Sequence, residues 1–415
     1  MYGFYCCALN KKKIFNDPVY GFVSVPYEII FDLIEHPYFQ RLRNIKQLGL
    51  THLVYPGALH TRFHHALGAM HLMGIALETL RSKGIDITDD EAKATTIAIL
   101  LHDIGHGPFS HALESCIVPS IHHEDLSILL MRRLNVEFKG ELTLAIEIFE
   151  DKYAKKFLHQ LVSSQLDMDR MDYLNRDSFY TGVSEGVIGF DRILKMIYVM
   201  NDQLVIEEKG IYSVEKFLIA RRLMYWQVYF HKTVIAAEQL LLKILKRAKE
   251  LAINGHPLFA SPSFEFLLKN NPSADDFKGD PRFLDAFANI DDHDIYTSIK
   301  VWINDTDRVL SLLCSELINR RLYSIEIQKD AINVEQAELR EAELVKNWQI
   351  APELVHYFVF TGIINNNAYN PDGGKIFILT KTKGLQDIAV FSDGLNLDAL
   401  SKTVQKHFIC YPKYR

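Results

Sequence analysis

The stretch Leu101–His111, LHDIGHGPFSH, places three histidines and an aspartate directly after an apolar run. Thr88 and Glu91 have the spacing of a capping box ahead of that run. The pattern predicts a helix that starts after Thr88, continues to about Asp103 and stops at Gly105. We expect a functional site at this helix end, because its side chains are of the kinds that bind metals or carry protons.

His102 and Asp103 can reach one metal ion just off this helix, because adjacent helical residues point about 100° apart. Two more ligands could come from His65, on a helix predicted over residues 62–82, and from the acidic segment Leu166–Asp172, LDMDRMD. Imidazoles and carboxylates suit one divalent Mn, Fe, Co, Ni or Zn ion and disfavour calcium, which binds oxygen ligands. A lone His-Asp pair is more often a surface capping pair, but its surroundings weigh against that interpretation.

Histidines are concentrated around this helix end. Ten of the 17 histidines lie between residues 52 and 123, where an even spread over 415 residues would place about three. Histidine is the common ligand of transition metals and the usual proton carrier near neutral pH. The same 72-residue window is therefore expected to hold the functional site.

The composition is that of an ordinary globular protein, with 48% hydrophobic and 24% charged residues and a net charge of −6. The acidic balance gives no support to a nucleic-acid binder, and no apolar run reaches the roughly 18 residues that a membrane span needs. The five scattered cysteines form no zinc-type pairs and suit a reducing compartment. We therefore expect a cytoplasmic protein without membrane segments.

Periodicity predicts a mostly α fold, with a helical core over residues 1–255 and a smaller α+β C-terminal part over 256–415. Turn residues near Asn254-Gly255 and between 270 and 281 suggest the boundary. The C-terminal part is expected to pack on the core and to take part in oligomer contacts. The predicted helices include 38–48, 62–82, 152–179 and 213–252, and the predicted C-terminal strands are 355–364, 375–381 and 387–391.

Together with Asp169, the segments Leu59–Gly68 (LHTRFHHALG) and Leu101–His111 resemble the H…HD…D signature of HD-domain phosphohydrolases. The similarity is closer to one branch, the deoxynucleoside triphosphate (dNTP) triphosphohydrolases. This branch includes bacterial dGTPases and the animal enzyme that joins a SAM domain to an HD domain. The resemblance extends from about residue 14 to residue 250 and implies an HD-domain helical core.

The resemblance implies specific roles at the metal. The implied metal ligands are His65, His102, Asp103 and Asp169, with Asp167 as a nearby structural carboxylate. In the catalytic group, which also includes Asp103, His111 would act on the attacking water or leaving oxygen, supported by His123 and Glu114. The animal relative has an aspartate in place of Glu114, so the relay would be one methylene longer here.

The resemblance also implies substrate contacts. Four cations would surround the triphosphate, and the sugar would be held by a glutamine, a leucine, an aspartate and a tyrosine that leaves no room for a 2′-hydroxyl. Base preference does not carry over, because Tyr225 and Phe230 differ from the animal relative. The implied phosphate contacts are Arg62, Arg170, Arg221 and Lys232, and the sugar contacts are Gln47, Leu48, Asp177 and either Tyr173 or Tyr229.

A further segment, Glu35, Gln40 and Arg43, resembles the place where the animal relative binds an activating nucleotide between subunits. The alternative is a plain amphipathic helix whose charged residues are solvated. The activator interpretation predicts a homo-oligomer, a tetramer or larger, in which one nucleotide stimulates hydrolysis of another.

The sequence thus predicts a metal-dependent dNTP triphosphohydrolase that yields deoxynucleoside and inorganic triphosphate, where Mg could accompany the substrate triphosphate. One alternative is an HD phosphohydrolase acting on another nucleotide, either a 5′-monophosphate or a signalling nucleotide. A second is a nucleotide-sensing regulator without turnover, which the intact set of proposed ligands argues against.

Overall fold

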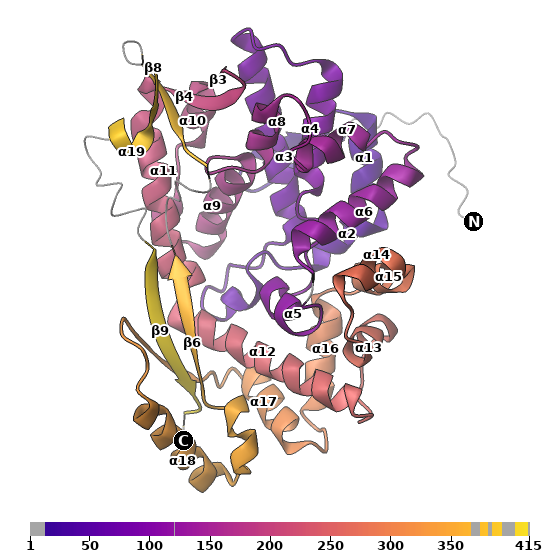
Figure 1. Ribbon diagram of the computed structural model, residues 1–415, viewed down its shortest axis with the longest axis vertical. Helices are drawn as coiled ribbons and strands as arrows, with labels where there is room; N and C mark the ends of the chain where they lie inside the picture. The colour runs from indigo at the N-terminus through magenta and orange to yellow at the C-terminus, as the bar shows by residue number, and fades with distance from the viewer. Residues whose placement is uncertain (1–12, 120, 367–373, 381–383, 392–402, 414–415) are drawn as a thin grey trace.

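The computed structural model describes residues 13–119, 121–366, 374–380, 384–391 and 403–413, and helices form most of it (Figure 1). This confirms the predicted mostly α fold with a smaller α+β C-terminal part. The first helices are α1 (Glu28–Glu35), α2 (Pro37–Gln40), α3 (Arg62–Ser82), α4 (Asp89–Leu101), α5 (Ser110–Cys116), α6 (His123–Glu137) and α7 (Thr143–Phe149). They are followed by α8 (Lys156–Val162), α9 (Met168–Thr181), α10 (Phe190–Met196), α11 (Ile211–Met224) and α12 (Lys232–Ile253).

Helix α3 lies at the centre of the site-bearing region, packed against α4 and α9. It is buried along most of its length, as expected for a helix with neighbours on several sides. The capping box predicted at the start of α4 is present, since Thr88 Oγ1 accepts from Glu91 N and Glu91 Oε2 accepts from Thr88 N. Packing of α4 and α9 on α3 brings together the three segments that carry the predicted metal ligands.

The helix predicted over residues 38–48 is wrong in its second half. After α2 the chain forms one 3-10 turn, Arg41–Asn44, and becomes extended at Ile45. There the backbone pairs with the start of α3: Arg62 N donates to Ile45 O at 2.9 Å and Gln47 N donates to His60 O at 3.0 Å. Periodicity could not reveal these long-range bonds.

The helix predicted over residues 152–179 is two helices, α8 and α9, separated by residues 163–167. Asp167 causes the break by capping α9, because its Oδ1 accepts from Arg170 N at 2.7 Å and its Oδ2 accepts from Ser164 N at 2.7 Å. Asp169 consequently lies in the first turn of α9. This contact also gives a physical basis for the structural role predicted for Asp167.

The long helix predicted over residues 213–252 is also interrupted. Helix α11 ends in a π-helical turn, Tyr225–Tyr229, and α12 starts after His231, whose ring accepts from Thr233 N at 3.2 Å. Such π turns occur frequently at functional sites. The interruption turns Tyr229 and the face of α12 that carries Ile235 and Leu242 toward a common cavity.

Three small sheets complete the described part of the fold. In one of them, strand β7 (Phe377–Thr380) pairs in parallel with β4 (Gln203–Glu207), so strands β7 and β8 of the C-terminal part extend a sheet that begins at Ile197, and Figure 1 shows β8 beside β3 and β4. The domain boundary near residue 255 stays a prediction. The strands are β1 (Ile14–Asp17), β2 (Gly21–Ser24), β3 (Ile197–Met200), β4 (Gln203–Glu207), β5 (Ser324–Gln328), β6 (Phe360–Asn366), β7 (Phe377–Thr380), β8 (Gly384–Asp387) and β9 (Val404–Tyr411).

The C-terminal part contains more helix than predicted. The strand expected over residues 387–391 is wrong, because β8 ends at Asp387 and a helical turn follows it. Among the described helices, none is long and apolar enough to cross a membrane. The helices of this part are α13 (Pro262–Lys269), α14 (Ala274–Gly279), α15 (Pro281–Ala288), α16 (Asp292–Trp302), α17 (Arg308–Ile318), α18 (Val334–Trp348) and α19 (Ile388–Phe391).

The contact between α3 and α9 requires a glycine at Gly68, since a Cβ there would overlap Asp172 Oδ1 and Arg176 Nη2. We expect Gly68→Ala to lower the free energy of unfolding by about 1–3 kcal/mol through overpacking. Gly74, on the same helix, has nothing within 4 Å of its Cβ position. Gly74→Ala is therefore the matched control and should raise stability by about 0.5–1 kcal/mol. Urea unfolding followed by circular dichroism measures both, and equal effects would contradict this packing.

Candidate metal centre and adjacent cavity

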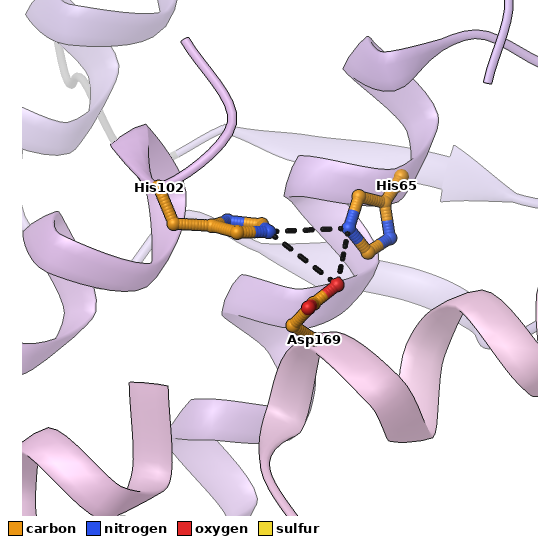
Figure 2. A group of neighbouring side chains, drawn as sticks. All are labelled: His65, His102 and Asp169. Carbon is orange, nitrogen blue, oxygen red and sulfur yellow. Dashed lines mark hydrogen bonds and ion pairs between the residues drawn. The ribbon is translucent and has the colours of Figure 1, made fainter. Parts of the chain in front are cut away.

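Three side chains from three helices converge on one point (Figure 2). His65 comes from α3, His102 from the end of α4 and Asp169 from the first turn of α9. Their ligand atoms lie within 4.8 Å of one another. His65 Nε2 lies 3.3 Å from His102 Nε2 and 3.1 Å from Asp169 Oδ1, and His102 Nε2 lies 3.5 Å from Asp169 Oδ1. Two ligands bound at about 2.1 Å to one ion lie about 3.0–3.4 Å apart, so this spacing fits a divalent transition metal.

The outward-facing nitrogens of both histidines have acceptors. His65 Nδ1 lies 2.7 Å from Asp172 Oδ2, and His102 Nδ1 lies 2.7 Å from Ile99 O. With Nδ1–H donating to these oxygens, each neutral ring presents the lone pair of Nε2 to the other ring. Two lone pairs 3.3 Å apart repel unless a cation lies between them. The donor set therefore fits a metal ion at this point.

The charges around His65 lead to the same conclusion. Burial lowers the pKa of His65, but its bonds to Asp169 and Asp172 outweigh burial and raise that pKa to about 10. Burial alone would raise the pKa of Asp169, whereas its bonds to His102 and His65 hold it well below its usual range. The site therefore stabilises a positive charge here, carried by a proton or by a metal ion.

Asp103, the fourth predicted ligand, adjoins this group. Its Oδ1 lies 3.3 Å from His102 Nε2 and its Oδ2 lies 3.8 Å from His65 Nε2. Arg62 Nη1 donates to Asp103 Oδ2 at 2.5 Å, and both residues are 8% exposed. A guanidinium thus lies directly beside the proposed metal position.

A chain of buried ion pairs orients the His65 ring by contacting its Nδ1 side, opposite the nitrogen that faces the other ligands. Asp172 Oδ2 accepts from Arg176 Nε at 2.9 Å, Asp172 Oδ1 accepts from Arg176 Nη2 at 3.0 Å, and Arg176 Nη1 donates to Asp17 Oδ2 at 2.7 Å. Arg176 and Asp17 were given no role from the sequence, and Asp172 was considered only as one of three aspartates that could bind the metal. The spacing of Asp172 and Arg176, four residues apart on one helix, was the available signal.

The predicted proton-transfer group is close to Asp103. His123 Nδ1 lies 3.3 Å from Glu114 Oε1, and the rings of His106 and His123 stack with centroids 3.9 Å apart. Burial lowers the pKa of His123, but Glu114 outweighs that effect and raises it. Burial and the charge of Arg62 lower the pKa of His106 to about 3, so His106 is neutral near pH 7.

His106 was given no role by our sequence analysis, although it lies between the two predicted groups: its Nε2 is 3.2 Å from Asp103 Oδ1. His111 lies in the first turn of α5, and its side chain is outside the described residues. The catalytic role of His111 stays a prediction.

A cavity of about 350 Å³ opens beside Arg62. Its walls include four residues predicted to bind substrate, namely Gln47, Leu48, Arg62 and Tyr229. The volume falls in the range of small-molecule sites. The structure thus brings one predicted phosphate contact and three predicted sugar contacts into one cavity.

Asp177 contacts Tyr229 but is not part of the cavity wall. Tyr229 Oη donates to Asp177 Oδ2 at 2.7 Å, while His60 Nε2 lies 2.7 Å from Asp177 Oδ1. His60 and Asp177 are both at least 99% buried. His60 was not assigned by our sequence analysis, and its position in the motif Leu59–Gly68 was the only hint.

Other predicted substrate residues lie outside the lining of this cavity. Tyr173 packs edge-on against Tyr229, with centroids 6.3 Å apart. Arg170 and Arg221 both contact the segment before α9: Arg170 Nε donates to Ser164 O at 2.6 Å, and Arg221 Nη1 donates to Gln165 Oε1 at 3.2 Å.

Lys232 is exposed at the start of α12. The structure does not bring it to the cavity wall, and its phosphate contact stays a prediction.

The predicted activator segment is engaged within the chain. Gln40 Nε2 donates to Ile34 O at 2.7 Å and Gln40 Oε1 accepts from Arg43 Nε at 2.7 Å. The Arg43 guanidinium also lies 3.6 Å from the centroid of the Phe63 ring. Glu35 and Arg43 are exposed, and a nucleotide site at this segment stays a prediction.

Two protein-family models match the part of the chain that carries these residues. The HD domain family model matches residues 62–177, and the HD associated region model matches residues 188–259. An uncharacterized protein of Bacillus subtilis, YwfO, is 38% identical over 76% of this chain and 72% of its own length. A solved phosphohydrolase structure from Bacteroides thetaiotaomicron is 51% identical, covers 97% of this chain and all of its own, and superposes with a TM-score of 0.94.

A protein of Dictyostelium discoideum named as a deoxynucleoside triphosphate triphosphohydrolase SAMHD1 homolog is 35% identical over 54% of this chain. The chain spans about half (47%) of the length of that relative. Fold and site together define a metal-dependent phosphohydrolase. The chain belongs to the HD-domain phosphohydrolase family, in which its relatives include proteins named as dNTP triphosphohydrolases.

The bond between His65 and Asp172 predicts an effect on metal affinity. Asp172→Asn keeps the size of the side chain but removes its charge, so we expect metal affinity to fall about 10–100-fold. Competition with a chromogenic chelator measures this affinity. Asp330→Asn, at an exposed bend, is the matched control. Unchanged affinity in Asp172→Asn would show that the carboxylate does not tune the ligand.

Proposed function

We propose that this chain hydrolyses deoxynucleoside triphosphates to deoxynucleosides and inorganic triphosphate. The observation that carries the proposal is the position of Arg62. Its guanidinium bonds Asp103 beside the metal-ligand group, and the same side chain lines the cavity that contains Gln47, Leu48 and Tyr229. A nucleotide in this cavity would have its phosphates next to the metal position.

The metal ligands in this proposal are His65, His102, Asp103 and Asp169. When bound, a divalent cation, which we propose to be Mn, Fe, Co, Ni or Zn, supplies Lewis acidity at the phosphoryl group. Mg could accompany the triphosphate as its counter-ion. Arg62 would neutralise charge that builds on the phosphate oxygens, and its planar fork suits bidentate phosphate contacts.

The reaction requires two proton movements. Water attacks the α-phosphorus and loses a proton, and the bond from phosphorus to the 5′-oxygen breaks, so that oxygen gains one. The predicted group for these transfers is His111, supported by the His123–Glu114 pair at 3.3 Å. The short chain from Glu114 through the stacked rings of His123 and His106 to Asp103 links this group to the metal ligands.

The cavity also supports a preference for deoxyribose. The Tyr229 ring is held by its hydroxyl bond to Asp177 and by edge contacts with Tyr225 and Tyr173. A tyrosine fixed in this way can exclude a 2′-hydroxyl by its ring. Gln47 Oε1 is buried and has no hydrogen-bond partner in the described part of the chain, so it is available to a sugar hydroxyl.

We further propose a cytoplasmic homo-oligomer. Cys116, Cys314 and Cys410 are buried and unpaired among the described residues, as suits a reducing compartment.

Hydrolysis of a 5′-monophosphate or a signalling nucleotide is the alternative reaction for the same metal site. The products distinguish these reactions, because only the proposed one releases inorganic triphosphate.

Loss of a metal ligand should abolish turnover without unfolding the protein. Asp169→Ala removes one of three converging ligands, so we expect less bound metal by elemental analysis. We also expect near-background release of triphosphate from each dNTP, followed by ion-exchange chromatography. Asp330→Ala at the exposed bend is the control. If Asp169→Ala keeps its full metal content, the proposed ligand set is wrong. If the wild type releases phosphate or pyrophosphate instead of triphosphate, the proposed reaction is excluded.

Sugar selection should depend on the ring of Tyr229 more than on its hydroxyl. Tyr229→Ala should raise the ratio of GTP to dGTP hydrolysis by about 10-fold or more, because the space for a 2′-hydroxyl opens. Tyr229→Phe keeps the ring and should retain most of the selectivity. The measured quantity is kcat/KM for each nucleotide. Equal hydrolysis of GTP and dGTP by the wild-type protein would already contradict deoxyribose selection.

A further inference from the structure

Glu238 is a carboxylic acid on the cavity wall formed by α12. Helix α12 contributes one face to the cavity, with Ile235, Glu238, Gln239 and Leu242 at the spacing of successive turns. An acidic side chain is unexpected on a face that is otherwise largely apolar. It calls for a physical explanation.

Glu238 forms no hydrogen bond or ion pair with any other residue in the described part of the chain. The two cations on the cavity wall are engaged elsewhere, since Lys46 pairs with Asp292 at 3.3 Å and Arg62 pairs with Asp103 at 2.5 Å. Burial raises the pKa of Glu238 to about 7. Glu238 is partly buried, and a partly desolvated carboxyl without a partner in the chain is typical of a group available to a ligand.

The distribution of charge decides which part of a nucleotide lies at Glu238. A carboxylate repels a triphosphate, so we expect the phosphates beside Arg62 and the metal ligands rather than beside Glu238. In the proposed function the sugar lies against Tyr229 and Gln47. The base is then the remaining part that can approach Glu238.

The walls of the same cavity suit a planar ring. Leu48, Phe230, Ile235, Leu242 and Ile364 supply apolar surface, and Ile364 comes from strand β6 of the C-terminal part. Apolar faces with one polar group at the edge are the arrangement expected of a base-binding site.

We propose that Glu238 is a specificity-determining residue that recognises guanine through its N1–H and N2–H groups. This inference rests on the proposed function. Guanine alone among the four bases presents two adjacent donors on its Watson–Crick edge, and a carboxylate accepts both with its two oxygens. Adenine and cytosine each present an acceptor next to a donor, and thymine flanks one donor with acceptors, so each sets a lone pair against a carboxylate oxygen.

The test compares dGTP, dATP and dITP with wild type and Glu238→Gln at pH 8, where the Glu238 carboxyl is mainly ionised. dITP keeps the N1–H donor and lacks the 2-amino group. The amide of Glu238→Gln offers one donor and one acceptor, so it matches adenine and can no longer accept from both the N1–H and N2–H groups of guanine. Glu78→Gln, on the exposed face of α3, is the matched control.

We expect wild type to prefer dGTP to both dATP and dITP in kcat/KM. In Glu238→Gln the ratio of dGTP to dATP should fall by at least about 10-fold and the preference for dGTP over dITP should vanish, with metal content unchanged. An unchanged ratio in Glu238→Gln, or a wild type without guanine preference, overturns the inference while dNTP hydrolysis stands.

Binding of dGMP and dAMP, measured by titration calorimetry, gives a second readout that needs no turnover. If wild type hydrolyses no dNTP, the proposed function fails. In that case tighter binding of dGMP than dAMP, lost in Glu238→Gln, still supports guanine recognition, and equal binding overturns it.

Discussion

The bond between His65 Nδ1 and Asp172 Oδ2 is the interaction on which the site depends. It fixes the ring of His65 so that Nε2 points at His102 and Asp169. Asp172 is fully buried, and a buried carboxylate is tolerated only when it is paired, which Arg176 and then Asp17 of strand β1 provide. The ion-pair chain therefore joins the N-terminal hairpin, α3 and α9 to the metal ligands. We therefore expect a change along this chain of ion pairs to alter the position of His65.

Part of this arrangement was predictable from the sequence, because it depends on local patterns. The capping box at Thr88 and the apolar run after it predicted α4 with His102 and Asp103 at its end. The segments Leu59–Gly68 and Leu101–His111, together with Asp169, predicted the family. Three features were not predictable from periodicity. The break before α9 comes from the side chain of Asp167, and the extended turn after α2 comes from backbone bonds to the start of α3. The addition of β7 to β4 joins strands about 170 residues apart.

Glu238 was missed for a related reason. When residues 213–252 are interpreted as one helix with apolar residues nearly all round, a single glutamate has no special position. The π-helical turn and the cap at His231 divide that segment and rotate the face with Glu238 toward the cavity. The signal that could have found it is a carboxylic acid between Ile235 and Leu242 on an apolar helix, since such a residue is seldom placed there without a partner.

The cavity wall carries groups of opposite charge, and this difference orients the substrate in the proposed function. Arg62 lies beside the metal ligands, whereas Glu238 faces the cavity from α12. A nucleotide carries all of its negative charge at one end. The reverse orientation would place the triphosphate against the Glu238 carboxyl and the uncharged base beside Arg62 and the metal position, both at an electrostatic cost. In the proposed function, therefore, only one orientation brings the α-phosphorus to the metal ligands, and Glu238 and Arg62 both contribute to it.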